Sequence, residues 1–254
     1  MRAMKIGAAA LLALGLGAGA AAASEAVHIE KQDWSFNGAF GTFDRASLQR
    51  GYQVYKEVCA ACHSMKFISF RNLRDIGFSE AEVKALAAQY EYPALDETGE
   101  ATTRKGTPAD RFHAPFANEL AARASNGGAL PPDLSLIGKA RVGGPDYIYA
   151  LLTGYHEVPA GFTLNAGMNY NAAFPGHQIA MAKPLNDDQV TFADGTKATT
   201  AQMAHDVSTF LMWTAEPKLE ERKRAGVKVM GFLAILTIFS FLTYRRVRKK
   251  VQGH

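Results

Sequence analysis

The chain has 254 residues, of which 28 are lysine or arginine and 24 are aspartate or glutamate, and its formal net charge is +4. Two cysteines exclude a disulfide-rich scaffold, and the basic balance does not indicate nucleic-acid binding because it comes from the two ends. Residues 24–217 contain 16 basic and 22 acidic residues, a net charge of −6. Such an acidic domain either attracts a basic partner or is simply kept soluble by its charge.

Residues 1–23 have the layout of a secretory signal peptide. Arg2 and Lys5 precede an Ala/Leu/Gly run, and small residues lead up to Ser24. The run is short and weakly apolar, which favours cleavage over an uncleaved anchor. We therefore expect an exported domain that begins near Ser24.

The first helix of that domain is expected to start at Asp44, which can act as its N-cap. Leu48, Tyr52 and Tyr55 then recur at helical spacing. The helix leads directly into the pentapeptide Cys59-Ala60-Ala61-Cys62-His63, which contains both cysteines of the chain.

This pentapeptide has the spacing by which haem is attached in c-type cytochromes. The thiols of Cys59 and Cys62 add to the porphyrin vinyl groups, and the imidazole of His63 ligates the iron. Three alternatives are weaker. A lone disulfide would close a very small loop, a redox pair would need a preceding strand and a helix opening at the first cysteine, and zinc would need a fourth ligand. We predict one covalent haem c.

Three more helices are expected in the exported domain. Ser79 and Glu82 form a capping box, Pro145 and Gly154 bracket a helix, and an apolar stripe over 200–215 predicts another. Strand evidence is limited to a possible hairpin turn at Asp194-Gly195. Residues 91–115, 125–132 and 159–184 show no period and are expected to be irregular, and 91–115 is a candidate partner contact.

Residues 227–244 predict a membrane-spanning helix. These 18 residues carry one charge, Lys228 at the edge, and are long enough to cross a bilayer. Five cations follow between Arg245 and Lys250, so the positive-inside rule places the 245–254 tail in the cytoplasm. We expect residues 24–217 to form the exported domain and 218–226 a juxtamembrane linker.

The sixth ligand of the iron has several candidates. Met168 and Met181 lie in expected loops, where a chain can cross the far face of a haem, whereas core packing explains Met203 and Met212 on a predicted helix. The histidines are weaker candidates, since most isolated histidines are surface or core residues. They are His113, His156, His177 and His205.

The chain resembles the cytochrome c1 family, the haem c subunits of cytochrome bc1 complexes, and specifically its bacterial members. The resemblance covers nearly the whole mature chain. It rests on Arg50–Tyr55 leading into the pentapeptide, Ala124–Ser135, Leu151–Tyr155, Phe174–Gly176, Ile179–Ala182, Asp194–Thr196 and the helix ending in Ala215–Pro217.

The resemblance implies which residues surround the haem. Met181, in its Pro-Gly-x-x-Ile-x-Met context, becomes the axial methionine and Met168 the second choice. Arg141 is the natural partner of a haem propionate, because its guanidinium matches a carboxylate. The remaining pocket residues carried over are Asn126, Ala129, Pro131, Pro132, Ile137, Tyr147, Leu151, Leu152 and Phe174. Some relatives have a second cysteine pair before the axial methionine; this chain has none, so its methionine loop must be held in another way.

We therefore expect a mainly α-helical, cytochrome-c-like haem domain with long loops and one C-terminal transmembrane helix. With both axial positions filled, the chain transfers electrons and has no catalytic site of its own. The resemblance implies cytochrome b, a Rieske iron–sulfur protein and a soluble or anchored cytochrome c as partners. It also implies a bacterial inner membrane, with the haem domain in the periplasm. The alternative is a membrane-tethered haem enzyme or sensor with a displaceable sixth ligand.

Overall fold

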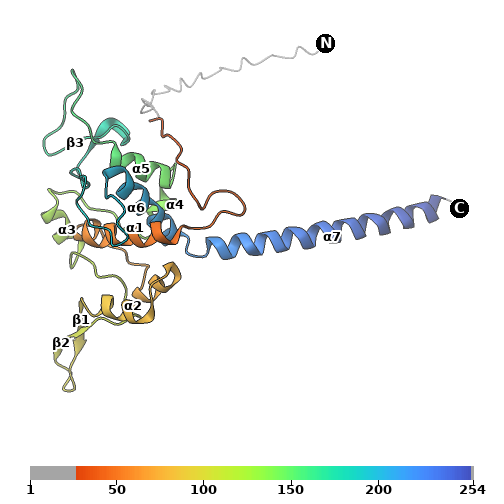
Figure 1. The fold of residues 1–254 in the computed structure, drawn as a ribbon, viewed down its shortest axis with the longest axis horizontal. Helices are drawn as coiled ribbons and strands as arrows, with labels where there is room; N and C mark the ends of the chain where they lie inside the picture. Colours follow the sequence, from red (N-terminus) through yellow and green to blue (C-terminus); the bar gives the residue numbers. More distant parts are fainter. Residues whose placement is uncertain (1–26, 253–254) are drawn as a thin grey trace, which may run out of the picture.

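The computed structural model describes residues 27–252, so the predicted signal peptide lies outside the described residues. A mainly helical domain is followed by one long helix that extends away from it (Figure 1). The α-helices are α1 (Arg45–Glu57), α2 (Glu80–Ala87), α3 (Glu119–Ser125), α4 (Ile137–Ala140), α5 (Pro145–Thr153), α6 (Thr200–Ala215) and α7 (Leu219–Gln252). The strands form two antiparallel pairs, β1 (Glu91–Leu95) with β2 (Ala101–Lys105) and β3 (Asn169–Tyr170) with β4 (Gln178–Ile179).

The predicted helix boundaries are confirmed where capping residues mark them. The Asp44 carboxylate accepts the Ala46 N–H at 2.9 Å at the start of α1. Ser79 and Glu82 form the expected capping box of α2, and Pro145 opens α5. The short helices α3 and α4 were not predicted, because segments of seven and four residues carry too little periodicity to be recognised.

Helices α1 and α6 form the centre of the domain, and α4 and α5 also pack on α6. The backbones of α1 and α6 approach closely at Gly51, where an added Cβ would lie 2.1 Å from the Asp206 carbonyl oxygen. Only glycine permits this approach. The side chains of Leu48, Val54 and Phe210 are completely buried at this contact.

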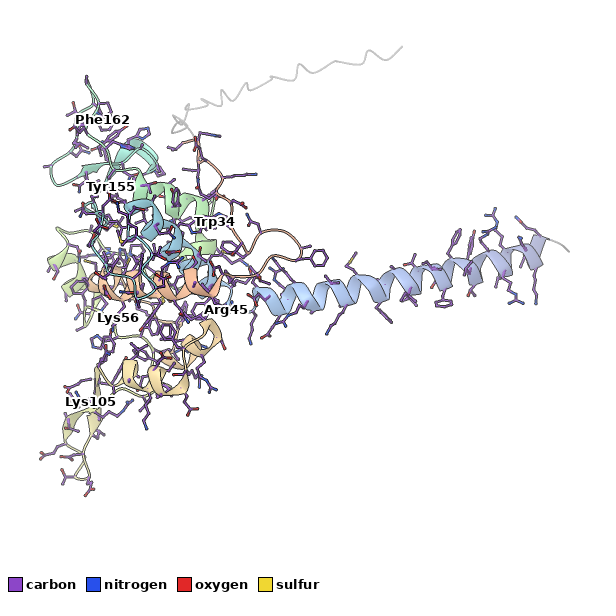
Figure 2. The ribbon with its side chains drawn as sticks, in the orientation of Figure 1. Trp34, Arg45, Lys56, Lys105, Tyr155 and Phe162 are labelled. Atoms are coloured by element: carbon purple, nitrogen blue, oxygen red, sulfur yellow. The ribbon has the colours of Figure 1, made fainter. Side chains whose placement is uncertain are left out.

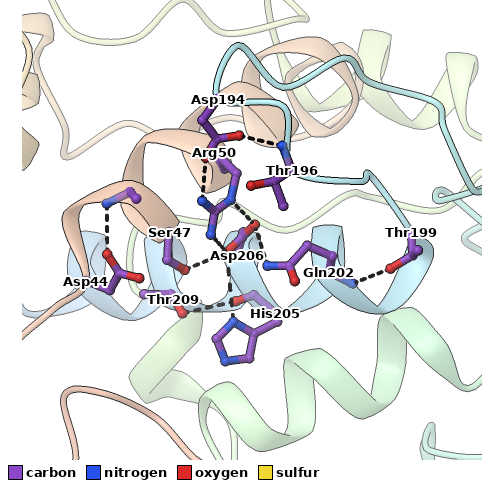
Figure 3. A network of polar contacts seen from close by, with 11 residues as sticks. Asp44, Ser47, Arg50, Asp194, Thr196, Thr199, Gln202, His205, Asp206 and Thr209 are labelled. Atoms are coloured by element: carbon purple, nitrogen blue, oxygen red, sulfur yellow. Dashed lines mark hydrogen bonds and ion pairs between the residues drawn. The ribbon is translucent and has the colours of Figure 1, made fainter.

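A buried ionic network also joins α1 to α6 (Figure 3). The Asp206 side chain is inaccessible to solvent and accepts hydrogen bonds from Ser47 Oγ at 2.6 Å and Arg50 Nε at 2.7 Å. Arg50 also donates to Asp194 at 2.7 Å. Burial favours the neutral acid, but polar contacts from His205, Arg50, Ser47 and Gln202 outweigh it and hold the pKa of Asp206 below its ordinary value.

Two expectations about strands were wrong. Residues around Asp194-Gly195 form a turn, with the Gly195 N–H donating to the Phe192 carbonyl at 3.1 Å, and no strand is assigned on either side of it. The stretch 91–115, expected to be irregular, contains the β1–β2 hairpin, and 159–184 contains the β3–β4 pair. The hairpin was missed because both its strands are largely exposed, so the sequence lacks the apolar alternation that marks a half-buried strand.

Helix α7 is long and apolar enough to cross a membrane, and its apolar window is not buried by the rest of the protein. This helix fits the predicted membrane anchor. The helix begins at Leu219, so the segment described above as a juxtamembrane linker is part of it. Its first turns are tied to the domain. Lys223 Nζ donates to the Phe36 and Gly41 carbonyls, and Glu220 accepts from the Phe43 N–H and pairs with Arg45 at 3.0 Å.

Candidate haem site

The two cysteines lie in a tight turn directly after α1. Val58 ends the helix, and a 3₁₀ turn over Cys59–Ala61 follows, closed by hydrogen bonds from the Cys62 and His63 N–H groups to the Cys59 carbonyl. Both cysteines are free thiols, with Cys59 half-buried and Cys62 exposed. The turn therefore places two thiols and an imidazole within five consecutive residues, as covalent haem attachment requires.

The competing interpretations of this pentapeptide find no support in the structure. Burial, assisted by the nearby Cys62, raises the pKa of the Cys59 thiol to about 12, whereas reactive redox cysteines have a lowered pKa. The pair also follows the α-helix α1 and opens only a three-residue 3₁₀ turn, not an α-helix. Within residues 27–252, no three His, Cys, Asp or Glu side chains come together as a metal site.

His63 is oriented by the loop that precedes α4. Its Nδ1 lies 2.8 Å from the Pro132 carbonyl oxygen. A carbonyl can only accept, so Nδ1 carries the proton and Nε2 keeps its lone pair free for iron. Burial lowers the pKa of His63, although the Pro132 carbonyl opposes the shift. The imidazole is thus held neutral, which is the form that ligates a metal.

Asp133 fastens this loop to the chain after His63. Its carboxylate accepts hydrogen bonds from Ser64 Oγ and the Lys66 N–H, both at 2.8 Å, and from the Ser135 N–H at 2.9 Å. The Leu134 N–H also donates to the Ser64 carbonyl at 2.9 Å. Sequence reasoning did not single out Asp133, although it lies inside the Ala124–Ser135 motif.

The predicted pocket residues on the histidine side lie between the end of α3 and the start of α4. Asn126 ends α3 and its side chain donates to the Ala122 carbonyl at 2.7 Å. The Ala129 N–H donates back to the Asn126 carbonyl, which forms a tight turn before Pro131. Asn126, Ala129, Pro131 and Ile137 are half-buried, and Pro132 is exposed. Their partly accessible apolar surface is what a haem would cover.

The remaining predicted pocket residues belong to α5 and the segment after it. Helix α5 carries Tyr147, Leu151 and Leu152. Leu152 is buried in the core, whereas Tyr147 and Leu151 are half-buried. Phe174 and Met181, farther along the chain, are also half-buried.

Arg141 ends α4 and is exposed, and it forms no ion pair with any residue of the described part of the chain. Its charge lies close enough to Tyr147 to oppose the rise in pKa that burial causes there. A free guanidinium beside a pocket residue fits the predicted role of holding a propionate.

The other candidate ligands are engaged elsewhere or lie outside the core. Met203 is completely buried, and Met212 packs against the same core. His113 packs against Tyr90 and Tyr92, His205 stacks on Trp34, and His177 Nδ1 bonds to the Ala172 carbonyl. His156 is exposed, and Met168 precedes β3.

The residues present fit a covalent haem. The pentapeptide offers two free thiols and a neutral imidazole with one free nitrogen. Most of the predicted pocket residues are half-buried and leave surface that a haem can cover. Together with the anchor helix, they define a membrane-anchored c-type cytochrome with one haem-attachment motif.

Comparison with known proteins agrees with this class. The model of the cytochrome C1 family matches residues 34–251. Cytochrome c1 of Rhodospirillum rubrum is 50% identical over 228 residues, which cover 83% of this chain and 84% of that protein. The cytochrome b-c1 complex catalytic subunit of Candida albicans is 52% identical over 221 residues, 86% of this chain and 77% of that protein. Cytochrome b/c1 of Bradyrhizobium diazoefficiens is 50% identical over 237 residues, 84% of this chain and 34% of that protein.

The chain belongs to the cytochrome c1 family. It carries covalently bound haem c and acts in electron transfer, so the predicted family, cofactor and role are confirmed.

Proposed function

We propose that this protein relays electrons from a Rieske iron–sulfur protein to a soluble or anchored cytochrome c, as a subunit of a complex with cytochrome b that oxidises quinol. The observation that carries the proposal is the hydrogen bond between His63 Nδ1 and the Pro132 carbonyl, because it leaves the other imidazole nitrogen free to ligate iron. The Bradyrhizobium relative is named cytochrome b/c1, and the Candida relative is named a catalytic subunit of the cytochrome b-c1 complex. Both names support cytochrome b as a partner.

We further propose that Cys59 and Cys62 hold the haem covalently and that His63 and Met181 ligate the iron. Haem c, when bound, supplies reversible one-electron chemistry. The protein's part is to hold the imidazole neutral, to bring the methionine loop to the opposite side and to cover the ring with the pocket residues of α3 to α5. With two protein ligands, no position stays open for a substrate, so an electron relay is favoured over a haem enzyme or sensor.

The same proposal includes the orientation of the chain in the membrane. Helix α7 ends in a cluster of cations, Arg245, Arg246, Arg248, Lys249 and Lys250. The positive-inside rule puts this end in the cytoplasm and the haem domain in the periplasm of a bacterial inner membrane. The side chains of α7 between Val227 and Val251 are exposed in the isolated chain, so lipid and the transmembrane helices of cytochrome b can both contact them.

Gentle detergent extraction of the tagged full chain, followed by identification of the copurifying proteins, tests the assembly. We expect cytochrome b and a Rieske protein to copurify, and quinol-dependent reduction of the haem. The oxidised protein should show a methionine–iron charge-transfer band. A high-spin spectrum, ready carbon monoxide binding and the absence of cytochrome b would favour the tethered enzyme or sensor.

A further inference from the structure

The segment that carries Met181 forms few hydrogen bonds. After β4 ends at Ile179, residues 180–185 make no backbone hydrogen bond with any part of the chain that the structure describes. Their one hydrogen bond to a side chain is from the Tyr155 hydroxyl to the Met181 carbonyl, at 3.0 Å. Between the buried side chains of Ile179 and Leu185, the Met181 backbone is therefore held by a single hydrogen-bond donor.

Tyr155 is itself in a firm place. It directly follows Gly154 at the end of α5, which packs on α6, and its backbone forms a β-bridge with Asn171. Next to it, the Ala172 N–H donates to the Gly154 carbonyl at 2.8 Å. In Figure 2, Phe162 lies at the outer end of the domain and Tyr155 closer to its centre.

Asn171 locks the two chain segments around Tyr155 together. Its side chain is completely buried and uses both ends of the amide. The nitrogen donates to the Leu151 carbonyl at 2.8 Å, and the oxygen accepts the Ala173 and Phe174 N–H groups at 3.0 and 3.1 Å. These three hydrogen bonds of a buried amide fix the backbone on both sides of the contact with Tyr155, so the Tyr155 ring extends from a well-defined backbone.

The Tyr155 side chain can serve this role because a phenol donates through its O–H group. Its ring is half-buried next to the segment that it contacts.

From this arrangement we propose that Tyr155 is a positioning residue for the sixth ligand: its hydroxyl holds the Met181 backbone where the thioether can reach iron. The inference rests on the proposed function, in which Met181 ligates the iron. Tyr155 directly follows α5, and this helix carries the predicted pocket residues Tyr147, Leu151 and Leu152. Helix α5 would therefore set both the wall of the pocket and the location of its methionine.

The test compares single substitutions in the full-length holoprotein, purified from membranes. Tyr155→Phe keeps the ring and removes the donor. One lost hydrogen bond of this kind should raise the methionine-dissociated population about fivefold, which corresponds to about 1 kcal/mol. We expect a weaker methionine–iron charge-transfer band, a larger fraction of reduced haem that binds carbon monoxide, and a lower reduction potential, with the haem still covalently attached.

Tyr170→Phe is the matched control. Tyr170 lies in β3 of the same segment, and its hydroxyl makes no hydrogen bond with residues 27–252. It should leave all three readouts at the wild-type level. Tyr155→His keeps an N–H donor on the side chain, but the ring is too short to reach the Met181 carbonyl. It therefore tests whether the donor must lie at the position of the tyrosine hydroxyl. We expect Tyr155→His to behave like Tyr155→Phe. If one of the two variants does not accumulate, the other still tests the inference.

Met181→Leu, measured in parallel, separates failure of this inference from failure of the proposed ligation. If Met181→Leu binds carbon monoxide while both Tyr155 variants match the wild type, Tyr155 does not position the ligand. An equal effect of Tyr170→Phe would overturn the inference too, since the loss would not be specific to the bond. If Met181→Leu itself matches the wild type, the axial assignment is wrong and the role of Tyr155 is lost with it.

Discussion

The two sides of the candidate haem site are held in different ways. On the histidine side, the loop around Pro132 is tied to the chain after His63 by at least five hydrogen bonds, most of them to the Asp133 and Ser135 side chains. On the methionine side, residues 180–185 receive one, from Tyr155. A loop with many bonds opens only when all break together, so the histidine side should be rigid and the methionine side displaceable.

This difference fits the chemistry of the two ligands. The histidine lies beside the covalent thioether bonds and needs one orientation from the moment of attachment. The proposed methionine ligand comes from a distant segment, and methionine ligation raises the reduction potential. The side with more hydrogen bonds is therefore the one next to the cysteines that attach the haem.

The largest expected effect is that of Met181→Leu. The haem should stay attached, because the histidine side is untouched, but the reduction potential should fall by on the order of 0.1 V or more, since axial ligands span roughly 0.8 V. A redox titration of the purified protein measures this. Met168→Leu is the control and should titrate like the wild type; the reverse result would mean that the other loop supplies the ligand.

The next effect concerns the frame that both sides share. Helix α1 leads into the cysteines and α6 supports α5, and Asp206 joins α1 to α6. Asp206→Ala leaves Arg50 with only the exposed Asp194, so the free energy of unfolding should fall by about 3 kcal/mol. Glu157→Ala is the control, because it removes a carboxylate at an exposed position. Asp188 is exposed too, but its positive φ of 58° would add a backbone effect.

Thermal unfolding of the holoprotein in detergent gives the comparison. Both sides of the site should weaken together in Asp206→Ala, seen as equal losses of haem absorbance and helical signal. Loss of the methionine band well before the helical signal would show that the two sides are not coupled through this network.

Acid should weaken the same network. Hydrogen bonds from Thr196 and then Arg50 lower the pKa of Asp194 to about 2, and the pKa of Asp206 is lowered as well. A carboxylate with a lowered folded-state pKa stabilises the fold fully above its unfolded value, near 3.9, and loses that contribution as the pH falls through the folded value. The difference in melting temperature between the wild type and Arg50→Met should therefore be constant from pH 7 to about 5 and shrink between about pH 4 and 2. A difference that grows on acidification would contradict this assignment.

The smallest effect is expected at the junction with the anchor. A chain ending at Glu221 should release a soluble, red, redox-active domain, but it lacks the Lys223 bonds to the Phe36 and Gly41 carbonyls. A chain ending at Gly226 keeps them and should be about 1–2 kcal/mol more stable in denaturant titration. Both should retain the methionine band, because neither cut touches the haem site. If neither folds, α7 is more than a tether.

Much of the fold could be predicted where local signals were strong. The caps at Asp44 and Ser79 and the proline at 145 marked real helix starts, because a cap acts on N–H groups within one turn. The exposed β1–β2 hairpin was missed, and the turn at Asp194 was mistaken for a hairpin. That turn is held from outside the segment as well, by the Arg50 guanidinium on α1, which no local pattern reveals.

The sequence by itself determined the haem-attachment motif and the apolar helix that fits a membrane anchor. Haem attachment needs five consecutive residues, and a membrane helix needs one continuous apolar run, so both are encoded locally. Only the tertiary structure decided how the ligands are held. His63 and Pro132 are 69 residues apart, and Tyr155 and Met181 are 26 apart. These pairs meet because the turn after α1 and the helices α4 and α5 are all positioned around α6, and packing of that kind depends on the whole chain.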